Sequence, residues 1–127
     1  MGTAKQTEEW FKQAEYDLGT AEAMFRSRRY IYTVFMCHLC LEKALKGLLS
    51  KRGHVPMKSH DLVFLLDRIG ADIPEQHAEF LEMLNEVSVP TRYPDELDQM
   101  VAQYPRKRAA EILELCREVY TWLKNCL

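Results

Sequence analysis

The sequence predicts an all-α protein, an up-and-down antiparallel bundle of four to five helices. Apolar residues recur at three- and four-residue steps over most of the chain, and no segment has the two-residue period of a strand. Only five glycines and five prolines interrupt the 127 residues, of which 47% are hydrophobic. A chain of this length can bury a core without metals or disulfides, so residues 1–127 are expected to form a single helical domain.

The first two helices are predicted by the longest periodic stretches. The first is expected from Thr7 to Arg26, and the second from Tyr30 to Lys51 after a short polar connection. The first half of the second helix is apolar nearly all round, which favours a place at the centre of the bundle. Gly53 is expected to end it, because glycine readily adopts the left-handed conformation that follows helix C-termini.

Two further helices are predicted from their capping residues. Ser59 is expected to be the N-cap of a short helix from His60 to Ile69, which Gly70 closes. Asp72-Ile73-Pro74-Glu75 has the spacing of a capping box and predicts another helix through Val87.

The segment from Ser88 to Tyr104 is expected to be mostly irregular and exposed, because Pro90 and Pro94 lie within it. Loops of such length often carry function. Apolar periodicity resumes after this segment and predicts a last helix from Pro105 to about Leu123.

The charge balance limits how this protein can bind anions. The formal net charge is -2, whereas a protein that contacts many phosphates is usually basic. Any anion site must therefore be local. Residues 1–10 lack a signal-peptide pattern, and the nearly apolar run from Tyr30 to Leu41 is too short for a membrane span. We expect a cytoplasmic protein with no membrane partner.

The cysteines indicate neither a disulfide framework nor a metal site. Cys37, Cys40 and Cys116 fall on apolar helical faces, which is typical of reduced core residues. Cys37 and Cys40 form a C-x-x-C pair, but no second pair of ligands follows to complete a zinc site. We therefore expect no metal and no cofactor.

Several motifs, in a fixed order along the chain, resemble those of the HEPN domain family. They are Trp10 with Ala14 and Asp17-Leu18, the block Glu42-Lys43-Ala44-Leu45-Lys46, the helix start Ser59-His60-Asp61-Leu62, and the loop Thr91-Arg92-Tyr93-Pro94-Asp95. The resemblance spans the chain. It implies an up-and-down helical bundle, commonly a homodimer, that is often encoded beside a minimal nucleotidyltransferase as its partner or antitoxin. We therefore expect a homodimer.

Some HEPN proteins are metal-independent ribonucleases, whose motif is an arginine followed by a histidine after four to six residues. This sequence lacks that motif, since seven residues separate Arg52 from His60 and eight separate Arg29 from His38. Whether the protein is an enzyme therefore stays open from the sequence.

Four residues are candidates for a polar cleft. Glu42 and Lys46 lie where the resemblance places family residues, and a lysine in a cleft can hold a phosphate; the alternative is an ordinary surface ion pair. His60 and Asp61 can act as a base and its orienting carboxylate, or can simply cap a helix start. His38, on the apolar stripe of the second helix, is expected to be an interior or interface residue.

Basic and aromatic residues later in the chain are candidates for contacts with a nucleotide or RNA. Arg92 can bind a phosphate while Tyr93 stacks on a base, unless this loop only packs against the bundle. Arg106, Lys107 and Arg108 start the last helix, where cations oppose the helix dipole and an anion would be stabilised. The alternative is a solvated basic turn that nearby glutamates balance.

These residues support three functional hypotheses. The first is a dimeric binding or regulatory module that binds a nucleotide or RNA, or that partners a minimal nucleotidyltransferase in a toxin-antitoxin-like pair. The second is a ribonuclease with a non-standard catalytic set, and the third is a purely structural helical interaction subunit. In the first, Arg92 and residues 106–108 bind phosphates, while Glu42, Lys46 and His60 shape the same cleft.

Overall fold

The computed structural model describes residues 4–55 and 58–127, in which six helices and no strand are found. The helices are α1 (Ala4–Arg26), α2 (Tyr30–Lys51), α3 (Leu62–Ile69), α4 (Glu75–Arg92), α5 (Leu97–Gln103) and α6 (Arg106–Asn125). The predicted all-α bundle is confirmed, with one helix more than the sequence indicates.

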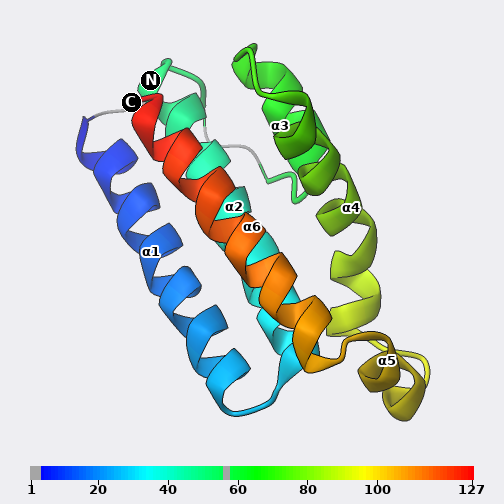
Figure 1. Ribbon diagram of the computed structural model, residues 1–127. Helices are drawn as coiled ribbons and strands as arrows, with labels where there is room; N and C mark the ends of the chain where they lie inside the picture. Colours follow the sequence, from blue (N-terminus) through cyan, green and yellow to red (C-terminus); the bar gives the residue numbers. More distant parts are fainter. Residues whose placement is uncertain (1–3, 56–57) are drawn as a thin grey trace.

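Helix α2 is the central element, as its composition predicts. It contacts all five other helices, and fifteen of its 22 residues are buried. Figure 1 shows α1 and α6 alongside α2, with α3 and α4 as a pair on the other side. A helix that is apolar nearly all round is stable only when neighbours cover most of its surface, which accounts for this position. Its bounds are those predicted.

A close approach between α1 and α2 depends on Gly47. A Cβ atom at this position would lie 2.6 Å from Cε2 of Phe11 and 3.2 Å from Cβ of Trp10. Carbon atoms normally pack about 3.5–4.0 Å apart, so only glycine fits without moving the Phe11 ring. The absence of a side chain here brings Trp10 directly against α2.

The start of α3 differs from the prediction. Asp61 rather than Ser59 is the N-cap, because its Oδ1 atom accepts hydrogen bonds from the backbone N–H groups of Val63 at 3.0 Å and Phe64 at 3.1 Å. The hydroxyl of Ser59 instead accepts from the N–H of Asp61 in the preceding turn. The helix therefore begins at Leu62, and His60 lies before it.

The predicted capping box of α4 is also wrong. Pro74 is the N-cap residue, and no side-chain hydrogen bond caps the helix. Its carbonyl accepts from the N–H groups of His77 and Ala78. Because Pro74 already supplies the extended backbone that precedes a helix, Glu75 becomes the first helical residue and Asp72 lies outside the first turn.

The expectation that the segment from Ser88 to Tyr104 is mostly irregular is wrong, whereas most of its residues are exposed, as expected. Helix α4 continues through Pro90 to Arg92, and α5 forms shortly after it. A proline this near a helix end removes only one backbone hydrogen bond, and the Thr91 hydroxyl donates to the Val87 carbonyl at 2.8 Å. The segment also ends in the core, since Tyr104 is 2% exposed.

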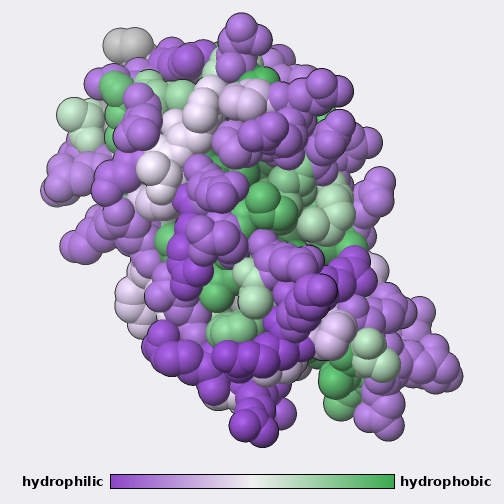
Figure 2. Space-filling model, viewed as in Figure 1, coloured by the Kyte–Doolittle hydropathy of each residue, from purple (hydrophilic) through white to green (hydrophobic). Residues whose placement is uncertain are grey.

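Helix α5 projects from the end of the bundle and has no buried residue. Leu97 and Val101 are exposed on it, and Figure 2 shows apolar atoms at this end of the molecule, at the lower right. The last helix, α6, begins one residue later than predicted and continues two residues beyond Leu123, to Asn125.

Candidate functional site

A row of three ionisable residues lies on the buried surface of α2. His38, Glu42 and Lys46 are spaced four residues apart, so they share one face of the helix. They are 1%, 3% and 7% exposed. The alternative of a surface ion pair between Glu42 and Lys46 is therefore wrong. We call these three residues the polar stripe.

Glu42 joins the polar stripe to the segment that precedes α3. Its Oε2 atom accepts hydrogen bonds from Nζ of Lys46 and from Nδ1 of His60, both at 3.0 Å. An ionised carboxylate has no hydrogen to donate, so Nδ1 of His60 carries the proton. In neutral His60 the other ring nitrogen, Nε2, is then a free acceptor on a side chain that is 70% exposed.

The carboxylate that orients His60 is Glu42, eighteen residues away, and not its neighbour Asp61. Asp61 caps α3 and also accepts a hydrogen bond from Nδ2 of Asn85 at 3.1 Å. The capping interpretation of Asp61 is thus confirmed. Nothing in the local sequence could show which carboxylate reaches His60.

His38 is confirmed as an interior residue. Burial is the main cause that lowers the pKa of its imidazole, and Arg92 acts in the same direction, while Glu42 and Asn85 oppose the shift. Nδ1 of His38 lies 3.8 Å from Oε1 of Glu42. This Oε1 atom has no hydrogen-bond partner among the described residues.

Arg92 lies at one end of the polar stripe. Its guanidinium carbon is 4.2 Å from the ring centroid of Phe35, which precedes His38 by three residues on α2. Its Nε atom is buried without a hydrogen-bond partner among the described residues. The neighbouring Tyr93 is 71% exposed, so its ring does not pack into the bundle.

The structure does not bring the three basic residues at the start of α6 into contact with the polar stripe. Arg106 lies over the Phe25 ring at the end of α1, at 4.8 Å from its centroid. Arg108 lies over Tyr104, at 4.5 Å, and donates to the carbonyl of Gln103. Lys107 is exposed. The basic cluster is thus a separate surface near α1 and α5.

Trp10 lies at the opposite end of the polar stripe from Arg92, and the sequence interpretation assigned it no role in binding. Nζ of Lys46 is 5.8 Å from the centroid of its ring. A hollow of about 260 Å³ lies beside it, lined by Gln6, Glu9, Trp10 and Gln13. We call this the Trp10 hollow. The sequence feature that could have identified Trp10 as a binding residue is its place among charged neighbours on a helix face. The structure leaves its ring partly exposed.

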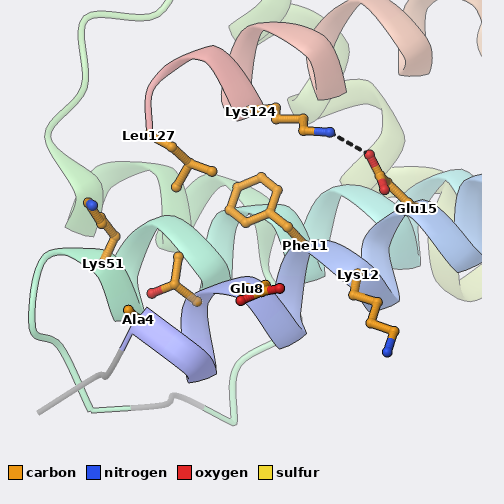
Figure 3. A pocket seen from close by; sticks show the side chains of 9 residues that line it. Ala4, Glu8, Phe11, Lys12, Glu15, Lys51, Lys124 and Leu127 are labelled. Atoms are coloured by element: carbon orange, nitrogen blue, oxygen red, sulfur yellow. Dashed lines mark hydrogen bonds and ion pairs between the residues drawn. The ribbon is translucent and has the colours of Figure 1, made fainter.

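Another hollow, of about 470 Å³, lies where α1, α2 and α6 meet near the chain ends. Figure 3 shows Phe11 and Leu127 within it and lysines and glutamates around it. Lys124 and Glu15 form an ion pair of 2.7 Å across its edge. None of the predicted site residues lines this hollow, and its charges are of both signs.

The cysteines are core residues, as predicted. Cys37, Cys40 and Cys116 are free and fully buried. The side chains of Cys37 and Cys40, together with burial, raise the pKa of the Cys116 thiol well above its usual value, so this thiol stays protonated. Within residues 4–55 and 58–127, no cluster of histidine, cysteine or acidic side chains has an arrangement that could hold a metal ion. No helix there is long and apolar enough to cross a membrane.

Comparisons with known proteins agree with the helical-bundle fold. The family model of the HEPN domain matches residues 7–126. The crystal structure of TT1696 from Thermus thermophilus is similar with a TM-score of 0.84 and 29% sequence identity, over 96% of this chain and 98% of that one. The crystal structure of ST0689, an archaeal HEPN homologue, is similar with a TM-score of 0.77 and 29% identity, over 94% and 95%. No curated protein matches the chain.

Proposed function

Since this chain belongs to the HEPN domain family, we propose that it is a nucleotide- or RNA-binding module whose phosphate site lies between Arg92 and Lys46. The observation that carries this proposal is the polar stripe itself. Ionisable side chains cost free energy to bury, and a well-packed apolar pair is often as stable as a buried ion pair. A functional role accounts for their presence on the central, mostly buried helix of the bundle.

The charge balance of the site favours an anionic ligand. Lys46 and Arg92 contribute two cations and Glu42 one anion, within a protein whose net charge is -2. His60 adds an exposed imidazole that can donate or accept a hydrogen bond at the ligand. The unpartnered Nε atom of Arg92 is a further donor that a phosphate oxygen or water can satisfy.

The length of the site favours a short single strand over a mononucleotide. Phe35, over whose ring Arg92 lies, precedes Lys46 by eleven positions on α2. At the helical rise of about 1.5 Å per residue this span is roughly 16 Å. One strand of stacked nucleotides rises about 3.4 Å per nucleotide, so roughly four to five nucleotides fit.

Binding of a fluorescently labelled single-stranded RNA, followed by anisotropy, tests the proposal. We expect Arg92→Ala to weaken binding about tenfold, the magnitude of one charge-assisted hydrogen bond. Arg117→Ala is the matched control, because Arg117 is a surface arginine on α6 that pairs with Glu22 and Glu114. Affinity should fall as salt is raised. Equal affinity of the Arg92 and Arg117 variants would contradict the assignment.

A separate variant tests whether the basic cluster contributes to binding. Replacing Arg106, Lys107 and Arg108 together by alanine should weaken binding less than Arg92→Ala, because their contacts lie at Phe25 and Tyr104. A larger loss of affinity in this triple variant than in Arg92→Ala would indicate that the phosphate site lies at the start of α6.

A second candidate function is that of a ribonuclease with a non-standard catalytic set. The observation that favours it is the His60–Glu42 pair, in which Nε2 of an exposed imidazole is left to accept a proton. Such an enzyme would cleave RNA in the presence of a chelator and leave single-stranded DNA, which lacks the 2′-hydroxyl, intact. We expect His60→Ala to abolish this cleavage. Cleavage that survives in His60→Ala protein would exclude the pair as its source.

We also propose that the chain forms a homodimer through α5. Leu97 and Val101 are 56% and 48% exposed on this helix. One hollow beside them is lined by Arg28 and Arg29, and another on α5 by Asp95 and Glu96. A two-fold axis would place the basic side of one copy against the acidic side of the other.

The molar mass in solution tests this interface. Light scattering should give twice the chain mass for the wild type and the single mass for the double variant Leu97→Glu, Val101→Glu. Leu115→Glu is the matched control, since Leu115 is an exposed leucine on α6. A dimer that persists in the double variant would place the interface elsewhere.

The resemblance also implies a minimal nucleotidyltransferase as protein partner, in a toxin-antitoxin-like pair. We propose that this chain pairs with a minimal nucleotidyltransferase whose gene lies beside its own. Co-expression followed by size-exclusion chromatography should yield one complex that contains both proteins. Separate elution of the two purified proteins at micromolar concentration would argue against it.

A further inference from the structure

We propose that the Trp10 hollow is a base-binding subsite, in which a nucleobase with an exocyclic amino group stacks on Trp10. This inference rests on the proposed function, because the phosphate next to that base would lie at Lys46 and His60. It extends the site beyond α2 to the exposed face of α1.

The position of Trp10 is the first argument. Its ring lies 5.8 Å from Nζ of Lys46, which is hydrogen-bonded to Glu42, and Glu42 in turn accepts from His60. An aromatic ring beside a cation and an imidazole is the combination that holds a base and its phosphate in single-strand binding sites.

The lining of the hollow is the second argument. The side chains around Trp10 are two carboxamides and one carboxylate, from Gln6, Gln13 and Glu9. Carboxamides and carboxylates are the groups that read base edges through hydrogen bonds. The volume of about 260 Å³ lies below that of sites for drug-sized ligands, so it suits one ring system.

Glu9 determines which bases fit. Its Oε1 atom accepts from Nε2 of Gln13 at 3.1 Å, which holds the carboxylate at the edge of the hollow. A carboxylate accepts hydrogen bonds from the amino groups of guanine, adenine or cytosine, whereas uracil has no exocyclic amino group. The subsite should therefore discriminate against uracil.

Tryptophan fluorescence gives a direct readout. Trp10 and Trp122 are the two tryptophans of the chain, so a Trp122→Phe background isolates the signal of Trp10. We expect a guanine-containing tetranucleotide to quench this fluorescence and an abasic tetranucleotide to leave it nearly unchanged. Tetrauridylate should bind more weakly than the guanine-containing strand, and Glu9→Gln should reduce that difference.

Variants of Trp10 complete the test. Trp10→Leu should lose about tenfold or more in affinity for the base-containing strand, as expected when stacking is removed, and should keep the affinity for the abasic strand. Trp10→Phe should retain most of the binding. Tyr16→Leu is the matched control, since Tyr16 is a 78% exposed aromatic residue on the same helix that does not line the hollow.

The outcomes separate this inference from the proposed function. If Arg92→Ala weakens binding but Trp10→Leu does not, the base-binding subsite is wrong and the phosphate site stands. Equal losses for base-containing and abasic strands in Trp10→Leu also overturn the inference, because they indicate a general structural effect. No binding of any strand by the wild type overturns both proposals.

Discussion

Replacement of Gly47 by alanine tests how closely α1 and α2 approach each other. The new Cβ atom would lie 2.6 Å and 2.7 Å from two ring carbons of Phe11. The ring must move by about 1 Å to restore normal carbon–carbon separations. Phe11 is 5% exposed and packs against the Tyr120 ring with a centroid distance of 6.2 Å, so this movement disturbs the core.

Two opposing effects determine how much Gly47→Ala changes the free energy of unfolding. Alanine is favoured over glycine within a helix by about 1 kcal/mol. Overpacking a core typically costs about 1–3 kcal/mol. We therefore expect Gly47→Ala to lower the free energy of unfolding by about 0–2 kcal/mol.

Gly19→Ala provides a control for the helix propensity alone. Gly19 is an exposed position of α1, and a Cβ atom there meets nothing within 4 Å. This variant should gain about 1 kcal/mol, so the two variants should differ by about 1–3 kcal/mol.

Urea unfolding followed by circular dichroism measures this difference. For a chain of this size about 1 kcal/mol corresponds to roughly 4 °C in Tm, which gives a second measurement. Equal stabilisation by both substitutions would refute the reasoning, because it would mean that α1 and α2 leave room for a methyl group at Gly47.

Three further predictions concern the polar stripe and the start of α3. Asp61→Ala should lower the free energy of unfolding by about 1–2 kcal/mol, and Ser59→Ala by less, because Asp61 caps α3; urea titrations would contradict this if Ser59→Ala were the costlier change. Lys46→Met should lower the free energy of unfolding by about 3–5 kcal/mol, because it leaves Glu42 buried without its cation. The double variant with Glu42→Leu should recover most of that loss. A double variant as unstable as Lys46→Met would contradict this prediction. Burial lowers the pKa of His38 in the folded state, so the unfolded chain takes up a proton first as the pH falls, and stability should decrease below about pH 6.5 by at most about 1.4 kcal/mol per pH unit. His38→Gln should flatten that decrease between pH 7.5 and 5.5, and an unchanged slope would place its origin in another group.

The helices with strong periodicity were predictable from the sequence. The bounds of α2 and its central position follow from its apolar pattern, and the ends of α1 and α6 agree within a few residues. Helix periodicity is a local property, because each backbone hydrogen bond joins residues four apart. The sequence-based prediction was wrong where two nearby residues could both serve as the N-cap of a helix. Ser59 and Asp61 are both good N-cap residues, and only the observed hydrogen bonds identify Asp61.

The continuation of α4 past Pro90 depended on tertiary structure. The proline predicts a break, yet the chain stays helical because Thr91 is fully buried and donates to Val87. Burial of this turn against the bundle outweighs the loss of one backbone hydrogen bond. Tyr104 likewise anchors the end of the segment in the core.

Some features of the candidate site could likewise be predicted from the sequence, and others depended on the tertiary structure. The sequence determined that Glu42 and Lys46 share a face of one helix, because their spacing alone places them there. Only the tertiary structure decided that this face is buried, that His60 reaches Glu42 across eighteen residues, and that Arg92 and Trp10 lie at its two ends. It also separated the basic residues at 106–108 from this site. The physical reason is that helix periodicity specifies which side chains lie together on one element, whereas the partners of that face depend on which elements pack against it.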